Sequence, residues 1–165
     1  MHIVCLDLEG VLVPEIWIAF SQRTGIADFS HTTRDEPDSL RTRYQVLILS
    51  DTFYEFADPL KQQLGRPTLL CHRLVVDAEG FVAQYVPRQP DPRRHAVNAL
   101  KSLNYHVIAA GDSCNDTGML AAADAGFFIH APAAIAAQFP QFRGHGSLAE
   151  LRASIDGAAA ALASS

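Results

Sequence analysis

Several features that would direct the search for a function are scarce in this sequence. Basic residues are few: 13 Lys and Arg stand against 18 Asp and Glu, which gives a net charge of −5. A negatively charged surface does not favour binding to nucleic acid or to an anionic membrane, because both bind positively charged surfaces. No apolar run approaches the roughly 20 residues that a helix needs to span a bilayer. We therefore expect neither nucleic acid nor a membrane as a partner.

Cysteine is also scarce. The three cysteines, Cys5, Cys71 and Cys114, are far apart, and no pair of them has the spacing of metal ligands. The seven histidines show no zinc pattern. Free thiols in a reducing cytoplasm are the simplest interpretation. Residues 1–7 look like a strand and not like a signal peptide, so we expect a cytoplasmic protein.

What the sequence does have is an alternation of strands and helices. Short apolar runs that end in polar residues are typical of buried parallel strands. We expect strands at 2–7, 44–49, 67–71, 106–110 and 126–129, a hairpin at 74–83, and helices at 16–23, 53–64, 92–103, 117–123 and 148–163. This order predicts one α/β domain over residues 1–165, with a mostly parallel five-stranded sheet plus a β-hairpin.

Polar side chains follow three of these strands. Asp7 ends the first strand, Ser50 follows the second and Asp112 follows the fourth. In an open α/β sheet, ligands bind outside the carboxyl ends of the strands. We therefore expect these three residues to share one site.

Asp7 and Glu9 form the first candidate motif. A carboxylate can attack phosphorus and form an aspartyl phosphate. A second carboxyl group nearby can protonate the leaving oxygen and then deprotonate the attacking water. The alternative is a strand end followed by a solvated turn, and these few residues alone do not decide between the two.

Two further segments could hold a phosphate group. Ser50, Asp51 and Thr52 combine a hydroxyl with the amides of a helix start, although an ordinary helix N-cap would look the same. Arg93 and Arg94 lie at the start of the helix 92–103, where a cation opposes the helix dipole. A bound anion nearby would make this placement favourable. The alternative interpretation is a pair of solvated arginines with no bound anion.

The loop 111–116 is the candidate metal site. Its sequence, Gly-Asp-Ser-Cys-Asn-Asp, directly follows a buried strand and contains two carboxylates, Asp112 and Asp116. Mg²⁺ prefers one or two carboxylates together with phosphate and water. A polar turn that caps the next helix is the alternative.

Taken in order, these motifs resemble the haloacid dehalogenase superfamily of phosphotransferases. That superfamily has an acid pair on the first strand, a Ser or Thr ending the second, a basic residue at a later helix start, and a Gly-Asp-acid loop on the fourth strand. Residues 5–17, 48–56 and 109–113 also look like the bacterial bifunctional phosphoserine phosphatases/homoserine phosphotransferases. The resemblance covers nearly the whole chain and implies a three-layer Rossmann-like fold.

The resemblance implies a catalytic and a metal-binding set. Asp7 would be the nucleophile and Glu9 the general acid/base. Mg²⁺ would be held by Asp7, by the backbone carbonyl of Glu9 and by Asp112, with Asp116 orienting the metal shell. The Glu at position 9 is a departure from most of the superfamily, which has Asp there.

The resemblance also implies residues that bind the substrate. Either Arg93 or Arg94 would take the place of a lysine that is usual in the superfamily. Glu15 would meet the amine of the substrate. The remaining residues expected around the phosphoryl group are Ser50, Asp51, Thr52 and Asn115.

The interval between Asp7 and Ser50 departs from these relatives, which insert a helical cap there. Only 43 positions separate the two residues, so the cap is truncated and we expect residues 14–43 to be its remnant. The predicted function is a Mg²⁺-dependent phosphatase or phosphotransferase for phosphoserine, with water or homoserine as the acceptor. The alternative is a weakly active or non-catalytic phosphate-binding module. The surface that a short cap leaves exposed makes a homodimer an option.

Overall fold

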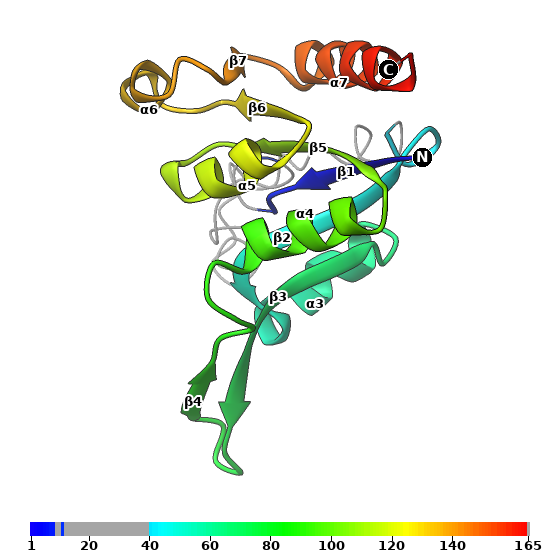
Figure 1. Ribbon diagram of the computed structural model, residues 1–165. Helices are drawn as coiled ribbons and strands as arrows, with labels where there is room; N and C mark the ends of the chain where they lie inside the picture. Colours follow the sequence, from blue (N-terminus) through cyan, green and yellow to red (C-terminus); the bar gives the residue numbers. More distant parts are fainter. Residues whose placement is uncertain (9–10, 12–39, 165) are drawn as a thin grey trace.

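A computed structural model describes residues 1–8, 11 and 40–164 (Figure 1). A seven-stranded sheet runs through the molecule in the order β4-β3-β2-β1-β5-β6-β7. Neighbouring strands are parallel except β3 and β4, which are antiparallel. The strands are β1 (His2–Leu6), β2 (Gln45–Phe53), β3 (Thr68–Val76), β4 (Val82–Val86), β5 (His106–Gly111), β6 (Ala125–Ile129) and β7 (Arg143–His145).

Helices cover both faces of this sheet. Alternate strand residues point to opposite faces, so two apolar clusters form. One cluster joins the sheet to α3 and α7, and the other joins it to α4, α5 and α6. The helices are α3 (Tyr54–Gln63), α4 (Pro92–Ser102), the 3₁₀ turn η2 (Cys114–Asp116), α5 (Thr117–Ala122), α6 (Ala133–Gln138) and α7 (Leu148–Ala163).

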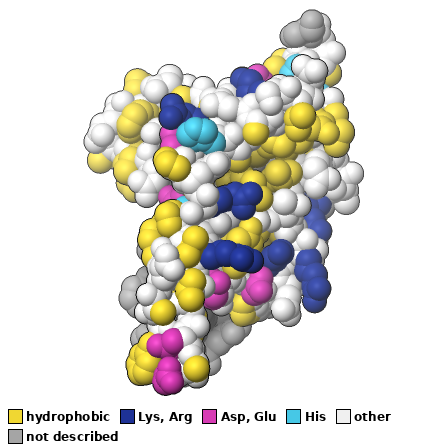
Figure 2. Space-filling model, turned by 60° about the horizontal axis from the view of Figure 1, so that its bottom comes forward, with side chains coloured by type: hydrophobic (Ala, Val, Ile, Leu, Met, Phe, Trp, Pro, Cys, Tyr) yellow, Lys and Arg dark blue, Asp and Glu magenta, His cyan; other side chains and the backbone are white. Residues whose placement is uncertain are grey.

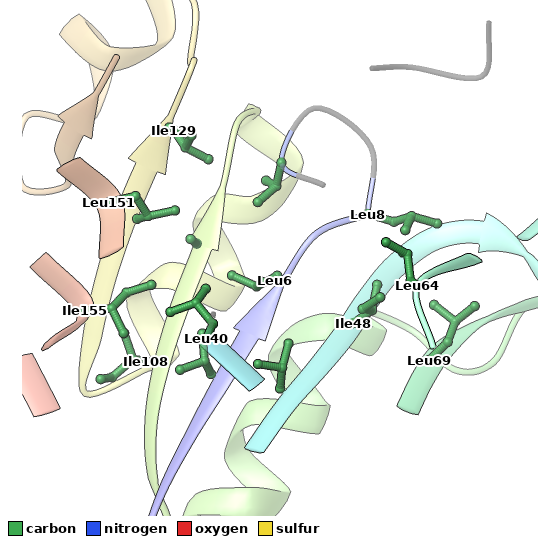
Figure 3. Packing of buried hydrophobic residues seen from close by; sticks show 14 of the residues in the cluster. Leu6, Leu8, Leu40, Ile48, Leu64, Leu69, Ile108, Ile129, Leu151 and Ile155 are labelled. Carbon is green, nitrogen blue, oxygen red and sulfur yellow. The ribbon is translucent and has the colours of Figure 1, made fainter. Parts of the chain in front are cut away.

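Strand β1 shows how the alternation divides the core. Leu6 faces the cluster of α3 and α7, whereas Cys5 faces the cluster of α4, α5 and α6. In Figure 3, Leu151 and Ile155 of α7 lie against the sheet near Ile108 and Ile129. Helix α7 therefore closes one face of the sheet over β5 and β6.

The predicted α/β domain with a mostly parallel sheet is confirmed, but details differ. The strand expected at 67–71 and the first arm of the hairpin form one strand, β3, and the second arm is β4. Strand β2 continues past Ser50 to Phe53, and its register with β3 shifts between Leu49 and Phe53. Strand β7 and helix α6 were not predicted. With only three residues, β7 is too short to show a clear period.

Two expectations for the first part of the chain lie outside the described residues. These are the helix at 16–23 and all but the last four residues of the expected cap remnant, 14–43. Among the helices that the structure does describe, each is too short or too polar to cross a membrane.

The packing of α7 against the sheet can be tested with a substitution that leaves a cavity in the core. Ile155 is completely buried, so Ile155→Ala should lower the free energy of unfolding by about 2–5 kcal/mol. Leu103, which is 66% exposed, offers a control: Leu103→Ala should change stability by less than about 0.5 kcal/mol. Urea unfolding of both variants gives the comparison. Equal losses would contradict the packing of α7 on the sheet.

Candidate active site

The candidate site lies at the carboxyl ends of β1, β2 and β5, in the middle of the sheet. Strand β1 pairs with β2 on one side and with β5 on the other. The backbone N–H of Asp7 continues this pairing and donates to the carbonyl of Ala110 at 3.1 Å. A cleft of about 290 Å³ opens there, lined by Asp7, Ser50, Asp51, Thr52, Phe53, Phe56, Arg93, Asp112, Ser113 and Asn115.

Asp7 is held at the bottom of this cleft. The apolar run of β1 is buried between the two helical layers, and Asp7 follows it with only 5% of its surface exposed. One carboxylate oxygen, Oδ1, accepts a hydrogen bond from the backbone N–H of Leu8 at 2.7 Å. The other, Oδ2, lies 3.3 Å from Nη1 of Arg93. The carboxylate is therefore fixed in orientation from two sides.

Arg93 connects three carboxylates. It lies in the first turn of α4 and is buried. Its Nη1 donates to Asp116 and lies near Asp7, and its Nη2 donates to Asp51 at 2.9 Å. Its Nε is buried and has no hydrogen-bond partner among the described residues.

The neighbouring Arg94 does not enter the cleft. Its side chain is half exposed and pairs with Asp91, the N-cap residue of α4, at 2.5 Å. Of the two cations that the sequence left as alternatives, Arg93 is the one placed beside Asp7.

Asp116 organises the loop after β5. It is completely buried, and its Oδ2 accepts from the backbone N–H groups of Asp112 and Ser113, both at 2.9 Å, and from the Ser113 hydroxyl at 3.1 Å. A Cβ atom at Gly111 would lie 2.2 Å from Cγ of Asp116. Only glycine at that position lets the carboxylate fold back beneath the loop. The Gly-Asp motif is explained by this close approach.

The cleft fits a hard divalent cation. Asp7, Asp112 and Asp116 each offer an oxygen atom, and these atoms lie within 4.8 Å of one another. Burial, and then the charge of Asp116, raise the pKa of the Asp7 carboxyl to about 8, which Arg93 offsets only in part. Oxygen ligands and an excess of negative charge are what Mg²⁺ requires of a site. The residues present therefore match the predicted metal.

His72, which the sequence interpretation does not single out, contacts Asp51 of the cleft. Its imidazole is buried, with Nε2 3.5 Å from Oδ1 of Asp51 and with Nδ1 accepting from the backbone N–H of Arg88 at 3.1 Å. Asp51 thus stands between His72 and Arg93. The available signal is the histidine inside the apolar run of β3.

The structure brings most of the predicted site residues together. Ser50 is buried at the wall of the cleft, and its hydroxyl oxygen accepts from the backbone N–H of Thr52 at 3.3 Å. Asp51, Thr52 and Asn115 line the same cleft. Glu9 and Glu15 lie outside the described residues. The roles assigned to all of these residues stay predictions.

Comparison with known proteins gives the family. No family model matches the chain. Over 182 residues it is 49% identical to a phosphoserine phosphatase of Pseudomonas syringae pv. tomato, covering 86% of this chain and 77% of the relative. It is also 49% identical over 182 residues to phosphoserine phosphatase ThrH of Pseudomonas aeruginosa, which covers 86% of this chain and 89% of that relative. The chain belongs to the phosphoserine phosphatase family.

Solved structures of this family have the same fold. A phosphoserine phosphatase in its apo form superposes with a TM-score of 0.65 at 16% identity, over 82% of this chain and 90% of that chain. A phospho-aspartyl intermediate analogue of phosphoserine phosphatase superposes with a TM-score of 0.62 at 15% identity, over 82% of this chain and 90% of that chain. The predicted likeness of this chain to phosphoserine phosphatases is confirmed.

The alignments with the family members also contain a gap. They run over 182 residues, whereas the aligned 86% of this chain of 165 amounts to about 142 residues. About 40 positions of each relative therefore have no counterpart in this chain. A gap of this size is what a truncated cap between Asp7 and Ser50 would produce.

The unusual pKa of Asp7 predicts how the stability of the metal-free protein depends on pH. The pKa is 3.8 in the unfolded chain and about 8 in the folded one, so between these values only the native state keeps the proton. Stability is then highest below the lower value and falls as pH rises toward 8, by up to about 1.4 kcal/mol per pH unit. Urea unfolding in EDTA from pH 5 to pH 8 measures the slope.

Two variants identify the source of that slope. Asp7→Asn removes the titrating group and should flatten the dependence. Asp58→Asn, on the exposed surface of α3, should leave it unchanged. A slope that is the same in Asp7→Asn as in the unmodified protein would contradict the assignment to Asp7.

Proposed function

We propose that this chain is a Mg²⁺-dependent phosphoserine phosphatase that forms an aspartyl phosphate on Asp7. The placement of Asp7 is the observation that carries the proposal. Its carboxylate is buried at the bottom of the cleft, with Arg93 3.3 Å away and with two further carboxylates within reach of a shared cation. The names of the two curated relatives, at 49% identity, support phosphoserine as the substrate.

The chain's own residues supply the binding of the phosphoryl group. Ser50 uses its oxygen as an acceptor for Thr52, so its own O–H remains able to donate into the cleft. Arg93 supplies positive charge beside Asp7. Mg²⁺ held by Asp7, Asp112 and the backbone carbonyl of Glu9, with Asp116 orienting the metal shell, would offset the charge of the phosphate and act as a Lewis acid.

Two transfers then complete the reaction. An oxygen of Asp7 attacks phosphorus, and the bond from phosphorus to the serine oxygen breaks while Glu9 gives that oxygen a proton. Glu9 next takes a proton from water, which attacks phosphorus and releases inorganic phosphate. Asp7 is regenerated as a carboxylate.

The proposal also covers the molecule that accepts the phosphoryl group. Residues 5–17, 48–56 and 109–113 resemble bifunctional enzymes, so we propose homoserine as a second acceptor, whose hydroxyl would replace water in the second transfer. ³¹P NMR of a reaction with added homoserine separates the two products. A cytoplasmic setting is supported by the three cysteines, none of which forms a disulfide.

Phosphate release from phosphoserine tests the proposed function. The unmodified chain should release phosphate with Mg²⁺ and not in excess EDTA. Asp7→Asn should abolish turnover, because an amide is a far poorer nucleophile than a carboxylate. Asp112→Asn should raise the Mg²⁺ concentration needed for half-maximal activity, because it removes one of few carboxylate ligands.

Asp58→Asn is the matched control and should behave like the unmodified chain. Full activity in excess EDTA would rule out the metal-assisted reaction. Phosphate binding without turnover would favour the alternative of a non-catalytic phosphate-binding module.

In related enzymes a cap contacts the part of the substrate beyond the phosphate. Because the cap of this chain is short, we expect weak selectivity between phosphoserine and other phosphate esters. The described lining of the cleft includes Phe53 and Phe56, which offer apolar surface and no polar group for the amino acid. We expect kcat/KM for phosphoserine and for an aryl phosphate to differ by less than ~10³-fold, about 4 kcal/mol of transition-state binding. A larger preference for phosphoserine, measured at the same Mg²⁺ concentration, would show that another part of the protein reads the amino acid.

A further inference from the structure

His72 is a buried histidine that lies beside the wall of the cleft and takes no part in the reaction described above. Only 6% of its surface is exposed. It occupies the position of β3 that pairs with Phe53 of β2, just past the shift in register. Its ring faces Asp51, which lines the cleft. A polar ring at a buried position needs an explanation, because burying polar groups costs free energy unless they are hydrogen-bonded.

The contacts of the imidazole fix its tautomer. Nδ1 accepts a hydrogen bond from the backbone N–H of Arg88 at 3.1 Å. A backbone N–H can only donate, so Nδ1 carries no proton and the ring proton is on Nε2. Nε2 lies 3.5 Å from Oδ1 of Asp51. The ring therefore presents its one N–H group on the side of this carboxylate.

Two aromatic rings hold the imidazole in this orientation. Tyr85 of β4 packs against it edge to face, with ring centroids 5.5 Å apart and ring planes at 87°. The ring of Phe53 lies 6.2 Å from the imidazole and 5.5 Å from Tyr85. Tyr85 is itself 51% exposed, and Figure 2 shows exposed hydrophobic side chains in groups bordered by charges of both signs. His72 thus has little freedom to turn away from Asp51.

Asp51 uses its second oxygen for Arg93. Oδ1 faces His72, whereas Oδ2 accepts from Nη2 of Arg93 at 2.9 Å. Nη1 of the same guanidinium lies 3.3 Å from Oδ2 of Asp7. The side chain of Asp51 is 45% exposed, so a contact on one oxygen alone would leave it free to rotate toward solvent. The contacts therefore link the imidazole, through one carboxylate and one guanidinium, to the proposed nucleophile.

We propose that His72 is a positioning residue, which orients Asp51 so that Asp51 holds the Arg93 guanidinium in place for the phosphoryl group. This role rests on the proposed function, in which Arg93 supplies positive charge beside Asp7. Groups that act on a substrate are held in place by supporting hydrogen bonds of this kind. A misplacement of about 1 Å can cost about 10²-fold in rate. Loss of His72 should therefore weaken phosphate binding and lower kcat/KM, although His72 itself does not touch the substrate.

Substitutions of His72 separate positioning from a purely structural role. His72→Gln places an amide N–H near the position of Nε2 and should keep the contact with Asp51. His72→Asn offers an oxygen near the position of Nδ1, so it should keep the contact with Arg88 and lose the one with Asp51. We expect kcat/KM for phosphoserine to fall about 10-fold or more in His72→Asn and less than about 3-fold in His72→Gln. A purely structural role predicts the opposite order.

Binding of inorganic phosphate gives a readout that does not depend on turnover. Isothermal titration calorimetry with Mg²⁺ present should show a dissociation constant about 10-fold higher in His72→Asn and nearly unchanged in His72→Gln. His72→Phe keeps the ring packing but has no nitrogen, so it should behave like His72→Asn.

His145→Asn is the matched control. His145 is 7% exposed, and its ring packs against Phe127 with centroids 5.6 Å apart, but it lies on β7, outside the lining of the cleft. This variant should leave both kcat/KM and the dissociation constant unchanged. Far-UV circular dichroism checks that all the variants are folded.

A double-mutant cycle shows whether His72 acts through Asp51. Asp51→Ala removes the link, so adding His72→Asn to it should change the phosphate dissociation constant by less than about 2-fold. An equal effect of His72→Asn with and without Asp51, or a His72→Asn variant that matches the unmodified chain, would overturn the positioning role. Phosphate binding without release of phosphate from phosphoserine would contradict the proposed function alone, and the calorimetric comparison would still test His72. A chain that binds no phosphate would overturn both.

Discussion

The buried guanidinium of Arg93 joins carboxylates from three separate segments of the chain. Asp7 comes from the end of β1, Asp51 from β2 and Asp116 from the turn after β5. A buried charge without a partner costs several kcal/mol, and removing one member of a buried pair typically costs about 3–5 kcal/mol. The strand ends and the first turn of α4 are therefore held in one arrangement by a single side chain.

That arrangement leaves negative charge in excess, and the excess has a chemical use. Asp7, Asp112 and Asp116 converge on a small volume, and one arginine cannot neutralise them. A phosphate ester would add still more negative charge to the same cleft. A divalent cation resolves both problems, since it binds the carboxylates and attracts the phosphate. Burial destabilises the charged form of an isolated acid. Here the buried carboxylates together form a site for a metal and an anionic substrate.

The sequence allowed the centre of the site to be predicted, because strand ends and loop motifs are local features. Asp7 and Asp112 follow apolar strands, and the carboxyl ends of parallel strands lie at the same edge of a sheet. The choice between Arg93 and Arg94 could not be made, since it depends on which side of α4 faces the sheet. His72 was missed for a similar reason: its contact with Asp51 depends on the register of β2 and β3, which shifts just there. Strand β7, with three residues, was too short for its pattern to be recognised.

The central claim is that Asp7 carries the phosphoryl group during the reaction. Rapid acid quenching during turnover of phosphoserine, followed by proteolysis and mass spectrometry, tests it most directly. We predict that one peptide, the one containing Asp7, gains the mass of a phosphoryl group and loses it on treatment with hydroxylamine, as an acyl phosphate should. A phosphoryl group on any other residue, or turnover with no phosphorylated peptide at any quench time, would contradict the account.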